Sequence, residues 1–270
     1  MTLALALTTL CQAQSRKVIT LSSWDFSRDG KAWQQVAVPH DWAISGPFDK
    51  KWDLQMVAIE QNGETEKTEK SGRSGALPWI GEGMYKMNWT APKGYKRAVL
   101  VFDGAMSQPV VTVNGKEAGK WAYGYNAFRI DITPFIQFGK KNLIEVHLNN
   151  VEESSRWYPG GGLYRPVSVE LYGNENFSTW DTFVRTLKAD KQEAEVEVNA
   201  LLEGKTGKSG KTVIALLDEA GKKVAEQTVS GATPAVKTTL KVANPLLWSP
   251  ESPYLYQVKL TRYEGKKVAD

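Results

Sequence analysis

Cysteine and histidine are scarce in this 270-residue sequence, which contains one cysteine and two histidines. With Cys11 as its only cysteine, the chain cannot form an internal disulfide framework. No group of cysteines and histidines has the spacing of a zinc site. No Ser/His/Asp set and no phosphate-binding glycine loop stands out either. We therefore expect neither a metal site nor a cofactor.

Long hydrophobic runs are also lacking. The apolar run from Leu3 to Leu10 is too short to span a bilayer, which takes about 20 residues. Cys11-Gln12-Ala13 then places small residues at the spacing of a signal-peptidase site. We interpret residues 1–15 as the remnant of a signal peptide and expect a secreted or periplasmic protein without a membrane span. The usual positive n-region is missing, and a buried N-terminal strand is the alternative.

No strong excess of charge of one sign is present. The formal net charge is +4, and the lysines and arginines are spread along the chain. This pattern is typical of solvated surface, so we expect no nucleic-acid partner. Tryptophan, in contrast, is abundant, with ten residues of which most precede residue 158. Aromatic faces pack in cores, and they also stack on the apolar faces of sugar rings, which favours a carbohydrate as partner.

Apolar patterns of helical period are absent beyond about two turns, and alternation with a period of two dominates from Val18 onward. The strands predicted in the first part are Arg97–Asp103, Val110–Val113, Asn142–Leu148 and Val167–Leu171. The first two, followed by Asn114-Gly115, are predicted to be joined at a hairpin-type turn. Residues 16–172 therefore indicate an all-β, jelly-roll sandwich. Residues 55–75 are polar and charged, and we predict a long exposed loop there.

A second block, residues 173–270, shows short strands at nearly regular spacing. They are predicted at Thr182–Leu187, Glu193–Leu202, Lys211–Leu217, Lys223–Val229, Ala235–Val242 and Tyr254–Arg262. This spacing is typical of an immunoglobulin-like sandwich. Residues 267–270 begin a return strand that stops, and a bare edge invites aggregation. We therefore expect an incomplete domain and a chain that is a fragment.

Five motifs in a fixed order resemble one enzyme family. The first is VPHDW at residues 38–42, and the second consists of GMYK at 83–86, FDG at 102–104 and VNGK at 113–116. The third consists of Gly124-Tyr125, Phe128, Asp131-Ile132-Thr133, Asn142-Leu143 and Val146. The fourth is SSRWYPGGGLYR at 154–165, and the fifth is NPLLWSPESPYLY at 244–256. Together they cover nearly the whole chain. The first four resemble the sugar-binding domain of glycoside hydrolase family 2, and the fifth resembles its immunoglobulin-like domain. VPHDW and SSRWYPG are most similar to the β-galactosidase branch.

The resemblance implies that the catalytic machinery lies outside this chain. Glycoside hydrolysis usually needs two carboxyl groups flanking the scissile bond. In this family both are implied to be glutamates on a (β/α)8 barrel, and the sequence shows no such barrel pattern. We therefore expect no catalytic residue here and place the pair downstream of residue 270. A separate pair among Asp41, Asp49, Asp53 and Glu82 is the alternative.

The resemblance also implies that loops of the first domain shape the sugar subsite. Several relatives place an aspartate, which meets the sugar or a cation, at the position that is Arg156 here. A guanidinium cannot bind a cation, but it can donate two hydrogen bonds to sugar hydroxyls or to a carboxylate. Arg156 and Asp41 are thus candidate substrate-binding residues, with a structural ion pair or buried role as the alternative. Trp42 and Trp157 either stack on a sugar or fill the core.

These residues lead to one functional hypothesis and two alternatives. The chain is predicted to be the N-terminal part of a secreted glycoside hydrolase that cleaves terminal β-galactosides. Its partners would be the carbohydrate and the enzyme's own catalytic barrel, and an oligomer is compatible with the sequence. The fragment alone is expected to be inactive. A free-standing carbohydrate-binding module and a β-mannosidase or β-glucuronidase relative are the alternatives.

Overall fold

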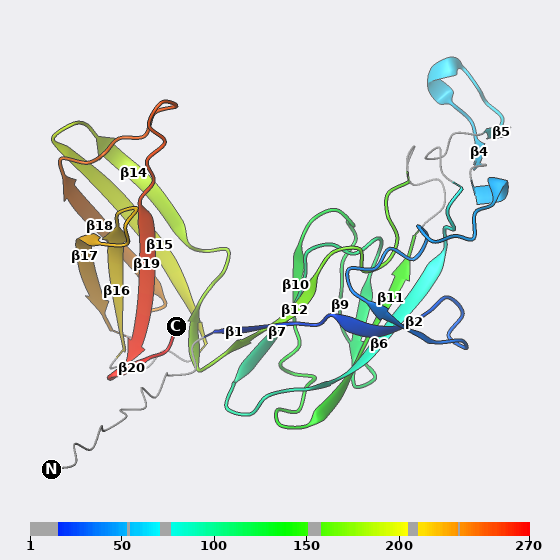
Figure 1. Cartoon of the computed structure of the whole chain (residues 1–270), viewed down its shortest axis with the longest axis horizontal. Helices are drawn as coiled ribbons and strands as arrows, with labels where there is room; N and C mark the ends of the chain where they lie inside the picture. Colours follow the sequence, from blue (N-terminus) through cyan, green and yellow to red (C-terminus); the bar gives the residue numbers. More distant parts are fainter. Residues whose placement is uncertain (1–15, 53–54, 71–76, 151–157, 205–209, 232) are drawn as a thin grey trace, which may run out of the picture. The chain divides into compact units, whose positions relative to one another are not determined.

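The computed structural model describes residues 16–52, 55–70, 77–150, 158–204, 210–231 and 233–270. These residues form an all-β protein, as the sequence predicts, with two short 3-10 helices as its only helices (Figure 1). Residues 18–93 and 97–171 gather in one compact unit, and residues 94–96 and 172–270 in another. None of the helices described is long and apolar enough to cross a membrane.

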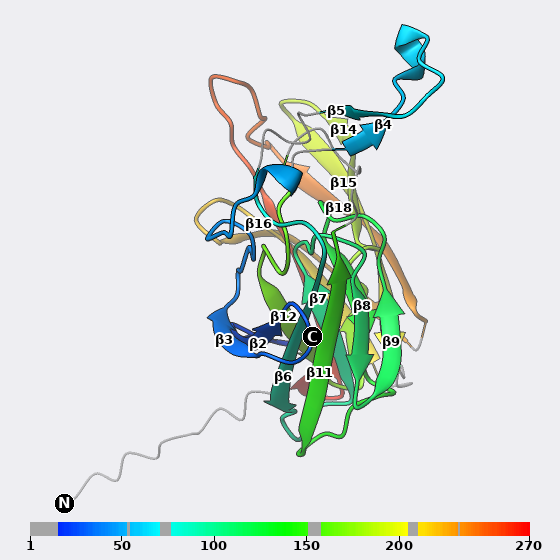
Figure 2. The same ribbon diagram turned by 90° about the vertical axis from the view of Figure 1, so that its right-hand side faces the viewer.

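The first unit is a sandwich of a four-stranded and a six-stranded sheet. The four-stranded sheet has the order β1 (Lys17–Thr20), β12 (Val167–Tyr172), β7 (Arg97–Phe102), β10 (Phe128–Asp131). The other has the order β3 (Gln34–Ala37), β2 (Ser23–Ser27), β6 (Glu82–Thr90), β11 (Lys141–Asn149), β8 (Val110–Val113), β9 (Lys116–Lys120). Figure 2 shows these six strands side by side.

Alternation in the sequence places the core of this sandwich. Along β11 the side chains of Ile144, Val146 and Leu148 are buried, and the residues between them face outward. Val146 lies opposite the fully buried Tyr85 of β6. Burying each such side chain contributes about 1.5–3 kcal/mol. The buried face of β11 therefore fixes its register against β6, because a slip by one residue would turn that face outward.

The predicted hairpin exists, but it joins other strands. Asn114 and Gly115 have φ values of 51° and 76°, as a type I′ turn requires. This turn connects β8 to β9. The prediction that β7 and β8 form the hairpin is wrong, because residues 103–109 cross between the two sheets and β7 pairs with β10 and β12.

The stretch predicted as a long exposed loop is mostly exposed in its described part, as predicted, but it carries regular structure, so the prediction of a loop is wrong there. A 3-10 helix (Lys50–Trp52) precedes it, β4 (Gln55–Val57) pairs with β5 (Thr68–Lys70), and a second 3-10 helix (Glu60–Asn62) lies between the strands. The Glu64 carboxylate accepts hydrogen bonds from Ile59 N at 2.9 Å and from Lys70 Nζ at 3.1 Å. These bonds hold together a ribbon that the polar sequence does not reveal.

The second unit is the immunoglobulin-like sandwich. In one sheet, β15 (Glu193–Gly204) pairs with β13 (Glu175–Phe177), β14 (Phe183–Ala189) and β18 (Ala235–Ala243). The other has the order β17 (Lys223–Ser230), β16 (Gly210–Leu217), β19 (Gln257–Glu264), β20 (Lys267–Val268). Val198, Ile214 and Leu240 lie at the centre of the core between the sheets.

A buried ion pair connects the two sheets of this second sandwich. Arg262 of β19 is 1% exposed and donates from Nε to the fully buried carboxylate of Glu175 in β13, at 2.6 Å. The same guanidinium donates to Gly231 O at 3.2 Å and lies 3.4 Å from Thr212 Oγ1. One arginine thus links four segments of the chain.

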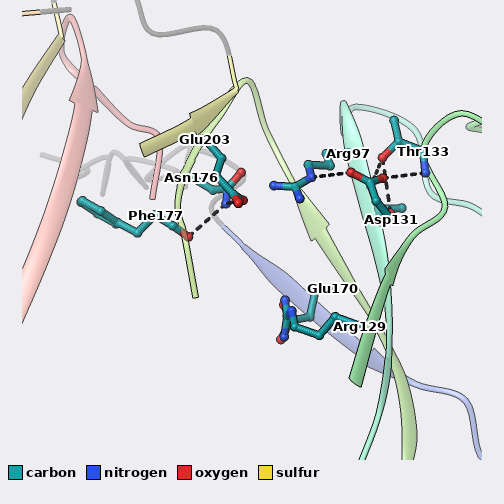
Figure 3. Close-up of polar contacts among 9 residues, drawn as sticks. Arg97, Arg129, Asp131, Thr133, Glu170, Asn176, Phe177 and Glu203 are labelled. Atoms are coloured by element: carbon teal, nitrogen blue, oxygen red, sulfur yellow. Dashed lines mark hydrogen bonds and ion pairs between the residues drawn. The ribbon is translucent and has the colours of Figure 1, made fainter. Parts of the chain in front are cut away.

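Charged side chains also pair across the strands of the first sandwich. Arg97 Nε donates to Asp131 Oδ2 at 2.9 Å, and Arg129 is paired with Glu170 (Figure 3). In the second unit, Asn176 Nδ2 donates to Phe177 O and to Glu203 Oε2 (Figure 3). Burial raises the pKa of Asp131, but hydrogen bonds from Thr133 and Arg97 together outweigh it and hold the pKa below its ordinary value. These contacts have structural roles: Arg97 and Asp131 join the neighbouring strands β7 and β10, Arg129 and Glu170 join β10 to β12 on the far side of β7, and Asn176 and Glu203 join β13 to β15.

Candidate functional site

Two motifs that lie far apart in the sequence meet at one end of the first sandwich. His40 N donates to Leu163 O at 2.8 Å, and Trp42 N donates to Gly161 O at 3.1 Å. The loop that contains VPHDW therefore runs beside the glycine-rich loop. A Cβ on Gly161 would lie 2.4 Å from Trp42 Nε1, and a Cβ on Gly162 would lie 2.3 Å from the Tyr85 hydroxyl. Only glycine allows this close approach.

Asp41 is held between these loops. Its Oδ1 accepts a hydrogen bond from Ala43 N at 3.1 Å and another from the Tyr158 hydroxyl. Burial, followed by the adjacent Asp41 carboxylate, raises the pKa of Tyr158 above its ordinary range. Tyr158 therefore remains a protonated donor at neutral pH, and it fixes the carboxylate in one orientation.

His40 and Tyr85 lie beside Asp41, with Tyr85 fully buried beneath the surface. His40 Nδ1 lies 2.7 Å from the Tyr85 hydroxyl, and both rings contact Phe26. Desolvation lowers the pKa of His40, with Arg28 acting in the same direction, while Asp41 opposes the shift. Burial raises the pKa of Tyr85 above its ordinary range. Both groups are therefore neutral at pH 7.

Trp42 packs beneath the loop. Its side chain is 2% exposed, and its ring contacts Phe26 and Trp79 at centroid distances of 5.8 and 5.3 Å. Its Nε1 has no hydrogen-bond partner among the described residues, and an unsatisfied buried donor costs about 1–3 kcal/mol. Core packing is one of the two roles left open by the sequence. A sugar contact of Trp42 stays a prediction.

A groove of about 820 Å³ opens over these residues, and its lining includes His40, Asp41, Asp29 and Trp33. Arg28 also lines it, but its Nη2 donates to Trp42 O at 2.9 Å and to Gly46 O at 3.0 Å. Its guanidinium also lies over the Trp79 ring, 4.6 Å from the centroid. The positive charge of Arg28 thus stabilises the loop wall, and an open polar groove of this size suits a small polar ligand.

The structure tests the other candidate residues only in part. Arg156 and Trp157 lie outside the described residues, so their contact with a sugar stays a prediction. Asp49 Oδ1 accepts from Lys51 N at 3.0 Å, and Glu82 Oε2 lies 3.2 Å from His147 Nε2 at the surface. Asp53 is outside the described residues. Across the ranges that the structure describes, no three metal-binding side chains form a group.

Sequence reasoning missed Tyr85, Tyr158 and Arg28. Tyr158 lies within the SSRWYPG motif, and its position beside the glycines was the available signal. Tyr85 lies within the GMYK motif, but nothing in the sequence pairs it with His40, from which it is 45 residues distant. The backbone carbonyls that Arg28 binds give no sequence signal.

The comparisons with known proteins agree with this architecture. A sequence profile of Glycosyl hydrolases family 2 matches residues 178–270. A β-galactosidase of Bacteroides ovatus is 32% identical, over 83% of this chain and 26% of the relative. A β-glucuronidase of Formosa agariphila is 25% identical, over 91% of this chain and 26% of the relative.

A solved structure extends the likeness over both sandwiches. A glycosyl hydrolase family 2 member from Bacteroides cellulosilyticus has a TM-score of 0.75 at 29% identity, over 95% of this chain and 34% of that one. The chain thus spans about a quarter to a third of the length of these proteins. The profile, the relatives and the structural match all indicate the same assignment: the chain belongs to glycoside hydrolase family 2.

Proposed function

We propose that this chain is the non-catalytic N-terminal part of a secreted glycoside hydrolase that cleaves terminal β-galactosides. The observation that carries the proposal is the coverage of the matches. They extend over 83–95% of this chain but only 26–34% of the longer proteins. The remaining length of such an enzyme would hold the barrel with the two catalytic carboxylates.

The groove beside Asp41 would form one wall of the sugar subsite. Asp41 is fixed by Ala43 N and Tyr158, so its carboxylate is pre-oriented before substrate arrives. A pre-oriented acceptor binds a sugar hydroxyl without first losing side-chain entropy. Arg156 lies four residues before Gly160 in the same sequence motif as Tyr158. We expect it to donate hydrogen bonds to the hydroxyls of the same sugar.

A β-glucuronidase is the second candidate, because relatives of both activities match this chain. The two substrates differ in charge, since a glucuronide carries a carboxylate and a galactoside is neutral. The described groove contains the carboxylates of Asp41 and Asp29, while Arg28 is engaged with two carbonyl groups. These two carboxylates outnumber the single positive charge of Arg28, and like charges repel, so the net negative charge of this wall would favour the neutral galactoside over the anionic glucuronide.

Our first prediction is that the 270-residue chain, purified alone, hydrolyses neither p-nitrophenyl β-galactoside nor p-nitrophenyl β-glucuronide above background. The reason is that both catalytic carboxylates would lie outside it. Release of p-nitrophenol followed by absorbance is the measurement. Turnover that is abolished by Asp41→Ala or Glu82→Ala would show an independent active site and contradict the proposal. In a longer enzyme that contains these domains, a higher kcat/KM for the glucuronide would replace the galactosidase assignment.

A further inference from the structure

A second aromatic surface lies just after β9. A cavity of about 500 Å³ is lined by Gln108, Val110, Lys120, Trp121, Ala122 and Tyr123. The side chains of Trp121 and Tyr123 are 40% and 59% exposed. None of these residues lines the groove beside Asp41. The volume lies within the roughly 300–1,000 Å³ usual for small-ligand sites.

The plane of Trp121 is fixed by the core. Its ring stacks on Phe128 at 5.6 Å with an interplanar angle of 6°, and Phe128 stacks on Phe102 at 4.6 Å and 8°. Phe102 and Phe128 are almost fully buried. The indole Nε1 donates to Asn126 Oδ1 at 2.8 Å, and Trp121 N donates to Pro109 O at 3.1 Å. One face of the indole is therefore held against the core, and the exposed area belongs to its other face and edge.

The residues that line this cavity also include polar ones. Gln108 offers an amide, Lys120 an ammonium group and Tyr123 a hydroxyl, and none of the lining residues is acidic. A flat aromatic face with hydrogen-bonding groups at its edge complements a sugar ring, which has an apolar C–H face and a rim of hydroxyls.

We propose that Trp121 and Tyr123 form a second, non-catalytic sugar-binding site that takes a pyranose ring of a neutral β-linked oligosaccharide. The pyranose ring stacks on the open face of Trp121, and Gln108 and Lys120 donate hydrogen bonds to the hydroxyls of the sugar. The site goes beyond the subsite at Asp41, because it would hold a distant part of a long substrate. It does not depend on which terminal sugar the enzyme removes.

The test uses the 270-residue chain itself and isothermal titration calorimetry with β-1,4-galactotetraose, cellotetraose and β-1,4-mannotetraose. An open, single-platform site should bind at least one of them with a Kd of about 0.1–1 mM. Trp121→Ala should weaken that binding roughly tenfold or more, since it removes the stacking face. Trp180→Ala is the matched control, because Trp180 is 74% exposed and does not line this cavity. It should bind like the wild type.

A thermal melt of each variant shows whether it is folded, and only folded variants are compared with the wild type in the binding titration. If Trp121→Ala fails to fold, Tyr123→Ala replaces it, because this side chain is exposed and its loss should weaken binding severalfold. The proposal is overturned if the wild-type chain binds none of the three tetrasaccharides. It is equally overturned if the folded variants bind as well as the wild type, or if Trp180→Ala lowers the affinity as much as Trp121→Ala.

Discussion

Single glycines decide how closely the two loops of the groove approach each other. Gly162 has a φ of 95°, and an added Cβ would lie 2.3 Å from the Tyr85 hydroxyl and 2.9 Å from His40 O. Gly115 also has a positive φ of 76°, but an added Cβ there would meet nothing within 4 Å. The two positions therefore share backbone strain and differ in steric contact.

Gly162→Ala should lower the free energy of unfolding of the first sandwich by about 2–4 kcal/mol, because strain and collision add. Gly115→Ala should lower it by only about 1–2 kcal/mol, the cost of the left-handed backbone alone. Urea unfolding of both variants measures the difference. Equal losses would mean that the Tyr85 contact relaxes freely and that the loops are not tightly packed.

The half-buried imidazole of His40 should make the first sandwich sensitive to mild acid. Because desolvation lowers the pKa of His40 below its ordinary 6.5, the unfolded chain takes up a proton at a higher pH than the folded chain does. The stability that His40 contributes is therefore full above about pH 6.5 and is lost as the pH falls toward the folded-state pKa.

His40→Asn should flatten this pH dependence, because the amide can keep the bond to Tyr85 without titrating. Thermal melts between about pH 7 and about pH 5.5 isolate the histidine, since most carboxylates titrate below this window. His147→Asn is the control, because His147 lies at the surface beside Glu82. Two results would contradict the role given to His40: a melting temperature that rises as the pH falls, or a pH dependence of the melting temperature that is the same in His40→Asn as in the wild type.

At the scale of strands, the sequence predicts those elements whose two faces differ clearly. β11 was predicted because apolar residues alternate with polar ones along it. β6 was not predicted, because Met84 puts an apolar residue on its outer face as well, which blurs the alternation. In the fold this side chain lies close to Gly30. The ribbon of β4 and β5 escaped prediction because its stability comes from Glu64 and Lys70 rather than from apolar burial.

The candidate site shows where this kind of prediction ends. Asp41 and the glycine-rich loop were identified from motifs, because both carry unusual residue types at fixed spacing. The contact between Asp41 and Tyr158 joins residues 117 positions apart, and only the folded sandwich brings them together. The stacking of Trp121 on Phe128 likewise depends on β9 and β10 lying close to each other, which no local pattern reveals.

At the scale of the whole second sandwich, breaking the pair of Arg262 and Glu175 should cost more than breaking a surface ion pair. Glu175→Gln would leave the Arg262 charge buried without a carboxylate, and breaking such a pair typically costs about 3–5 kcal/mol. The exposed pair of Lys223 and Glu226, with an N–O distance of 2.9 Å, offers a comparison. Glu226→Gln should cost less than about 1 kcal/mol.

Urea unfolding followed by the transition of the second sandwich tests this difference. The double variant Glu175→Leu with Arg262→Met should recover part of the loss, because it removes both buried charges and keeps apolar volume. A cost in Glu175→Gln no larger than that in Glu226→Gln would mean that water reaches Arg262. The sheets would then be held by their apolar core alone.

The same region of the second sandwich brings Asp270 next to β13. Phe177, just after the chain enters this unit, donates from its backbone N to Asp270 Oδ2 at 2.8 Å, while Glu175 binds Arg262. Entry at residue 174 and the segment around residue 270 therefore lie at the same pole of the sandwich (Figure 1). Two polar contacts thus fasten β13, near the point where the chain enters the sandwich, to the segment from β19 to Asp270. They restrain local fraying of this segment, because a strand that is tied down opens less readily than one held by its ladder alone.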